Sequence, residues 1–131
     1  MGQNEKTRAL LAAFGCALAY LLAGKVLTAV LPPLPEEAAR MWAFVHRCAA
    51  APIVEELVFR GAIQQLARPL GERQAVALQA VLFAVQHRGP AGMAYALVCG
   101  LVLGTIRSRT GSVWPGMLLH TLNNLLVFAA G

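Results

Sequence analysis

The chain has 131 residues, of which 58% are hydrophobic and 13% are charged, and its formal net charge is +5. A soluble domain averages about a quarter charged residues, so this composition argues against a surface that faces water alone and favours lipid. The basic residues stand singly between apolar runs, which argues against a nucleic-acid footprint. Three cysteines, Cys16, Cys48 and Cys99, lie in apolar runs and are expected to be buried thiols rather than a disulfide framework.

The first predicted element is an apolar helix over residues 9–31, long enough for the roughly 20 residues that cross a hydrocarbon core. Lys6 and Arg8 precede it, as they would in a signal peptide. The apolar run exceeds the roughly 7–15 residues of a signal, and no small-residue cleavage site ends it. We therefore expect a retained membrane helix, followed by a break at the prolines of residues 31–35.

Four further helices are predicted at about residues 38–66, 74–87, 91–106 and 113–130, with a kink at Pro52. A cytoplasmic N-terminus leaves only Arg40 and Arg88 in the opposite loops, which agrees with the positive-inside rule. The basic residues then on the cytoplasmic side are Lys6, Arg8, Arg68, Arg73, Arg107 and Arg109. The expected fold is all-α, a polytopic transmembrane bundle of about five helices. Residues 1–37 would form the N-terminal helix and Pro-rich linker, and residues 38–131 the core.

Ionisable residues inside apolar helices cost about 2.5–3.5 kcal/mol each at the bilayer centre, so they are candidates for function. Glu56 and Arg60 are four residues apart, share a helix face and can neutralise each other. Glu55 lies about 100° around the same helix and is left as the candidate proton acceptor for a water. A Glu–Arg pair can also serve packing alone, so the pair by itself does not establish a site.

Two other predicted helices bring polar groups to similar depths. His87 follows Phe83 by four residues, and Asn124 follows His120 by four, so each pair lies on one helix face. With a rise of 1.5 Å per residue, these groups and Glu55 overlap in depth. We predict that Glu55 and His87 hold and deprotonate a water. His120 and Asn124 would donate hydrogen bonds to the oxyanion that forms on a carbonyl.

The residues leave other interpretations open. Glu55, His87 and His120 can also ligate zinc, although the sequence has no His-Glu-x-x-His motif. We assume no cofactor, with a divalent metal such as zinc as the alternative. Asn123 and Asn124 can form structural hydrogen bonds between helices, and Gly100 with Gly104 more simply marks close helix packing. An aspartyl dyad is impossible because the chain contains no Asp.

Three motifs in order resemble those of the CAAX protease and bacteriocin-processing family, also called the Abi or Rce-type family. The segment from Glu55 to Arg60 is similar to its Glu-Glu-x-x-x-Arg motif, Phe83 to His87 to its Phe-x-x-x-His, and His120 to Asn124 to its His-x-x-x-Asn. The resemblance covers about residues 40–128. It implies an intramembrane endopeptidase in which Glu55, His87, His120 and Asn124 are catalytic and Glu56, Arg60 and Phe83 organise the site.

The resemblance also implies the partners and the location. The partners would be the lipid bilayer and a membrane-associated protein or peptide precursor, cleaved in CAAX-type or related C-terminal processing, with no nucleic acid. We expect a multi-pass protein of the cell membrane, in a bacterial inner membrane. The alternatives are a non-catalytic membrane immunity or partner protein with the same fold, and a small transporter component that uses Glu55 as a proton relay.

Overall fold

The computed structural model describes residues 2–130, and every regular element in that range is helical. The terminal residues of the two predicted domains, Met1 and Gly131, lie outside the described range. The first helix, α1 (Gln3–Val30), begins earlier than predicted because the polar residues before the apolar run are good helix formers. It ends at Leu31, whose extended backbone is the conformation favoured before a proline.

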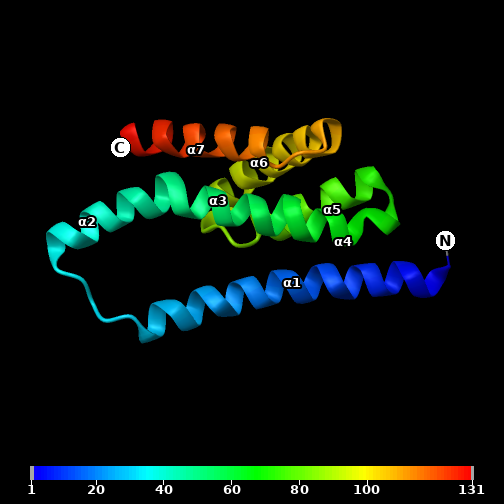
Figure 1. Cartoon of the computed structure of the whole chain (residues 1–131), viewed down its shortest axis with the longest axis horizontal. Helices are drawn as coiled ribbons and strands as arrows, with labels where there is room; N and C mark the ends of the chain where they lie inside the picture. Colours follow the sequence, from blue (N-terminus) through cyan, green and yellow to red (C-terminus); the bar gives the residue numbers. More distant parts are fainter. Residues whose placement is uncertain (1, 131) are drawn as a thin grey trace.

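A second, long helix runs without a break from residue 36 to residue 67. Its consecutive parts are α2 (Glu36–Val45), η1 (His46–Ala50), α3 (Ala51–Glu55), η2 (Glu56–Ile63) and α4 (Gln64–Ala67). The segments η1 and η2 are π-helical, a winding that is rare and often found at functional sites. Pro52 is the second residue of α3, just after η1, and the helix changes direction between α2 and α3 (Figure 1), as the predicted kink requires.

The remaining chain forms three helices, and the total of five helical segments agrees with the prediction. After the short turn η3 (Arg68–Leu70) come α5 (Glu72–Ala84), α6 (Gly89–Thr110) and α7 (Trp114–Ala129). The predicted end of α5 at His87 is wrong. The helix ends at Ala84, and His87 lies in the turn that leads to Gly89 and Pro90. Helix α6 extends four residues beyond the predicted Ile106 and is capped by Gly111 in the left-handed conformation (φ 70°).

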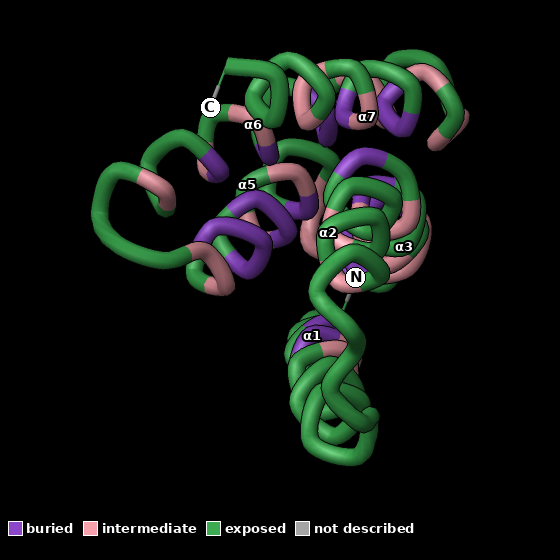
Figure 2. The backbone as a smooth tube through the Cα atoms, turned by 90° about the vertical axis from the view of Figure 1, so that its left-hand side faces the viewer, coloured by how far each residue is buried: buried purple, intermediate pink, exposed green. Residues whose placement is uncertain are grey.

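The long helix lies at the centre of the bundle, between α1 on one side and α7 on the other (Figure 1). Helix α1 packs on η2 and α4 through a stripe of small buried residues, Ala9, Ala13 and Ala17. Its other faces are exposed, and Figure 2 shows burial concentrated in α5 and around α3. Because many large apolar side chains are exposed on these outer faces, the surface is suited to lipid.

Helices α5 and α6 approach each other most closely at small residues. A Cβ atom at Gly100 would lie 2.9 Å from the Cα and Cβ atoms of Ala80, so only glycine fits there. This confirms the predicted close helix packing at Gly100. The three cysteines are free, but only Cys48 is buried, while Cys16 and Cys99 are half-buried. The expectation that all three are buried is therefore wrong for two of them within this chain.

Two of the helices in residues 2–130, α1 and α6, are long and apolar enough to cross a membrane by length and composition. The N-terminus, the turn between α4 and α5, and the turn between α6 and α7 lie at one end of the bundle (Figure 1). Most of the basic residues outside the long helix belong to this end, including Arg73 and Arg109. We call it the basic end.

Candidate active site

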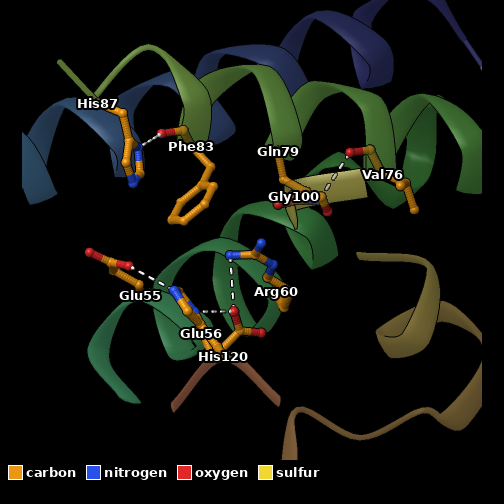
Figure 3. Close-up of polar contacts among 9 residues, drawn as sticks. All are labelled: Glu55, Glu56, Arg60, Val76, Gln79, Phe83, His87, Gly100 and His120. Carbon is orange, nitrogen blue, oxygen red and sulfur yellow. Dashed lines mark hydrogen bonds and ion pairs between the residues drawn. The ribbon is translucent and has the colours of Figure 1, made fainter. Parts of the chain in front are cut away.

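The deepest part of the site is a buried charge cluster. The carboxylate of Glu56 and the guanidinium of Arg60 are fully buried, and Glu56 Oε1 lies 3.1 Å from Arg60 Nη1. The same oxygen lies 3.0 Å from Nδ1 of His120, which reaches the cluster from α7 (Figure 3). A buried charge is tolerated only when it is paired and hydrogen-bonded. Glu56 Oε1 therefore makes two polar contacts, one to Arg60 within the long helix and one to His120 that connects the long helix to α7.

Glu55 occupies the more open side of the same cluster. Its side chain is 20% exposed, and its Oε2 lies 3.6 Å from Nε2 of His120. His120 thus places one ring nitrogen toward each of the two neighbouring glutamates (Figure 3). His87 faces Glu55 from the turn after α5 (Figure 3). The site therefore gathers side chains from three separate segments, as the sequence predicted for Glu55, His87 and His120.

The tautomer of His87 follows from its partner. Its Nδ1 lies 3.0 Å from the carbonyl oxygen of Phe83. A carbonyl can only accept, so the proton sits on Nδ1 and the ring donates there. The other nitrogen, Nε2, can then accept a hydrogen bond from a water.

Phe83 holds the site together as a shared packing surface. Its ring lies 4.5 Å beneath the guanidinium carbon of Arg60, an arrangement that favours the cation. The rings of His87 and His120 pack against its edges, with centroids 4.8 Å and 5.8 Å away. Phe83 is 2% exposed, so it positions both histidines without reaching the surface.

A glycine at the start of α7 makes room for Glu56. A Cβ atom at Gly116 would lie 2.8 Å from Glu56 Oε2. This oxygen has no hydrogen-bond partner among residues 2–130. It lies against the first turn of a 16-residue helix, where the helix dipole favours negative charge. The close approach of the carboxylate to α7 therefore depends on the absence of a side chain at position 116.

Asn124 lies one turn beyond His120 but is directed elsewhere. Its Nδ2 donates to the carbonyl oxygen of Arg47 in η1 at 2.9 Å, which ties α7 to the π-helical turn. Asn124 and Arg47 line one cavity of about 390 Å³, whereas His120 lines another of about 330 Å³ between α6 and α7. One of its two N–H groups is used by Arg47, and the second remains for a substrate. The oxyanion role of Asn124 stays a prediction.

Comparison with protein-family models matches residues 37–126 to the type II CAAX prenyl endopeptidase Rce1-like family. The match covers about two thirds of the chain and includes every residue of the site. The chain belongs to the Rce1-like family. The resemblance inferred from the three motifs is thereby confirmed, and the family is one of membrane-embedded proteases. No curated protein and no solved structure matches the chain.

The side chains of the Rce1-like site are arranged around one another and not around a metal ion. Among residues 2–130, no three His, Cys, Asp or Glu side chains are grouped closely enough to hold one. Both nitrogens of His120 already face carboxylates, and Nδ1 of His87 faces a backbone carbonyl. The alternative ligand set of Glu55, His87 and His120 therefore does not fit a metal ion in the arrangement that these side chains adopt.

Two polar residues near the Rce1-like site were not predicted. Gln64 and Gln79 are 1% and 0% exposed and form hydrogen bonds between helices. A signal for Gln64 was present in the sequence, because it continues the four-residue spacing of Glu56 and Arg60. Gln79 lies on a different helix, and only the tertiary packing brings it to the same place.

Proposed function

We propose that this protein is an intramembrane endopeptidase that hydrolyses a peptide bond in a membrane-associated protein or peptide precursor, in CAAX-type or related C-terminal processing. The observation that carries the proposal is the convergence of Glu55, His87 and His120 from three segments on one site, inside the family-matched region. The protein would be multi-pass, with the basic end in the cytoplasm of a bacterial cell.

The contacts of His120 define where protons must lie. Glu56 is paired with Arg60, so it is a carboxylate and accepts the Nδ1–H of His120. Nε2 of the same ring then faces Glu55 Oε2 at 3.6 Å. Two bare acceptors would repel each other at this distance, so one proton lies between them. With that proton on His120, two carboxylates balance one guanidinium and one imidazolium, which is the arrangement that a poorly solvated site favours.

The proposed reaction uses these protons and one water. The water lies between a carboxylate oxygen of Glu55 and Nε2 of His87, and its oxygen attacks the scissile carbonyl carbon. Its proton passes to Glu55, while the oxyanion accepts a hydrogen bond from Nε2–H of His120. The predicted oxyanion role of Asn124 requires its side chain to turn from the Arg47 carbonyl toward His120. The C–N bond then breaks and Glu55 gives its proton to the leaving nitrogen. No atom besides those of water and substrate is consumed.

The decisive experiment replaces Glu55 by Gln in protein reconstituted into liposomes. The substrate is a peptide that ends in Cys-a-a-X with a prenylated cysteine, and mass spectrometry measures the released C-terminal fragment. Loss of a general base typically lowers the rate about 10²–10⁴-fold, so cleavage by E55Q should fall by that factor. The matched control is Glu37→Gln, which removes an exposed carboxylate in the first turn of α2.

Unchanged cleavage by E55Q would refute the glutamate-dependent mechanism. If the wild type cleaved only the peptide without its prenyl group, the mechanism would stand and only the prenylated substrate class would be excluded. The alternative function, a non-catalytic immunity or partner protein, predicts no cleavage by the wild type in either form. No contact in the site favours this alternative over the enzyme.

A further inference from the structure

The buried amide groups of Gln64 and Gln79 take no part in the proposed mechanism. Nε2 of Gln79 donates to the carbonyl oxygens of Gly100 at 2.7 Å and Val76 at 3.1 Å. Nε2 of Gln64 donates to the carbonyl oxygen of Gly104 at 3.0 Å and to Ser108 Oγ at 3.0 Å. Carbonyl oxygens only accept, so these contacts fix which amide atom is nitrogen. The remaining atom of each amide, Oε1, is the oxygen and can only accept.

Both amide oxygens are buried acceptors in need of a donor. Oε1 of Gln64 and Oε1 of Gln79 have no hydrogen-bond partner within residues 2–130. Leaving a buried polar atom unsatisfied costs about 1–3 kcal/mol. The two amides meet at Gly104, where a Cβ atom would lie 2.3 Å from Gln79 Nε2 and 3.3 Å from Gln64 Oε1. The missing side chain at position 104 thus makes the space in which both amides lie.

Arg60, four residues before Gln64, has buried donors that lack an acceptor. Nε and Nη2 of Arg60 are buried and have no hydrogen-bond partner in the described chain. Arg60 stands one helical turn before Gln64, and its guanidinium lies between Glu56 and the Gln79–Gly100 contact (Figure 3). Arg60 stacks on Phe83, which follows Gln79 by four residues on α5, and Gln64 follows Arg60 by four, so the unpaired N–H groups and amide oxygens lie in one layer between the two helices. A water satisfies this set, since it accepts from Arg60 and donates to both amides, within the 2–4 hydrogen bonds typical of a buried water.

We propose that Arg60, Gln64 and Gln79 form an internal binding site for ordered water, and that this water holds Arg60 in place beneath the active site. Arg60 in turn holds Glu56, and Glu56 holds Nδ1 of His120. Gln64 and Gln79 are then positioning residues, and this part of the inference rests on the proposed function.

The water site connects to the basic end through polar contacts. Gln64 bonds Ser108, Ser108 Oγ donates to Glu72 Oε1, and Glu72 pairs with Arg68. Glu72 and Ser108 line a surface cavity of about 260 Å³ at that end. The cavity beside His120, by contrast, has walls of Leu, Val and Cys side chains apart from His120 and Asn123.

The test is nuclear magnetic resonance of the full chain in detergent micelles, with ¹⁵N in the arginine and glutamine side chains. We expect Overhauser cross-peaks from water to Arg60 Hε and to the amide protons of Gln64 and Gln79, with the sign of a long-lived bound water. Absence of these cross-peaks in the wild type would overturn the site, whatever its activity. This result is independent of cleavage, so it separates the failure of the water site from the failure of the proposed function.

Variants test the positioning role. Gln64→Met and Gln79→Met keep the length of the side chain and remove the amide, and they should abolish the water cross-peak of Arg60. The matched control is Gln65→Met, whose amide oxygen accepts from Arg68 near the surface. Because Arg60 would then shift and displace Glu56 and His120, the two variants should lower kcat by up to about 100-fold with KM unchanged. Loss of the cross-peak with unchanged kcat would overturn the positioning role, and an unfolded variant leaves the wild-type spectrum as the deciding measurement.

Discussion

Replacement of Glu56 by Gln tests the buried charge cluster most directly. The variant keeps an oxygen that can accept from Nδ1 of His120 but removes the negative charge that lies 3.1 Å from Arg60. Arg60 is then a buried cation without its adjacent anion. Removing one partner of a buried ion pair costs about 3–5 kcal/mol of unfolding free energy.

The structure indicates the lower end of this range. The ring of Phe83 still lies 4.5 Å from the Arg60 guanidinium carbon and continues to stabilise the cation. We therefore expect E56Q to lose about 3 kcal/mol. The double variant Glu56→Gln, Arg60→Met removes both charges and should regain about 1–3 kcal/mol of that loss, since residues in contact are not additive.

The assay is equilibrium unfolding in mixed detergent, followed by circular dichroism. The chain supplies its own control in Glu36 and Arg40, a pair with the same spacing and a distance of 3.2 Å whose side chains are 87% and 69% exposed. Glu36→Gln should change stability by no more than about 0.5 kcal/mol. Equal costs for E36Q and E56Q would refute the argument that burial gives the Glu56–Arg60 pair its energetic weight.

Three further predictions concern the close packing, the pH dependence and the metal. Gly116→Ala should cost about 1–3 kcal/mol in the same unfolding assay, because its Cβ would lie 2.8 Å from Glu56 Oε2. Gly15→Ala, which meets nothing within 4 Å on α1, should be neutral or stabilising, so equal costs would contradict this reasoning. The hydrogen bond from Ser108 and the nearby Arg68 lower the pKa of Glu72, at the basic end, below its usual value of 4.5. Its contribution to stability is present above pH 4.5 and is lost as the pH falls through the lowered pKa. Thermal unfolding of wild type and Glu72→Gln should therefore differ at neutral pH and converge in acid, and a constant difference would show that ionisation of Glu72 has no part. Cleavage should survive chelators, measured with elemental analysis of the active protein, and stoichiometric zinc whose removal abolishes cleavage would replace the metal-free mechanism.

Most residues of the candidate site could be predicted from the sequence because their signals are local. A charged residue in an apolar helix is costly wherever the helix goes, so Glu55, Glu56 and Arg60 stood out before any packing was known. The four-residue spacing of Glu56 and Arg60 predicted a contact that the structure contains. Helix ends were less certain. Helix α5 ends three residues before its predicted end at His87, because the chain turns there toward Gly89 and Pro90.

The amino-acid sequence by itself determined the helical class, the approximate limits of five helical segments, and the residues that must avoid lipid. These properties follow from hydrophobicity, periodicity and proline, which act over one or two helical turns. Only the tertiary structure decided that His120 faces both glutamates, that Asn124 donates to the Arg47 carbonyl, and that the amides of Gln64 and Gln79 meet at Gly104. Each of these contacts joins residues on different helices, so it depends on how the helices pack, and no spacing within the sequence contains that information.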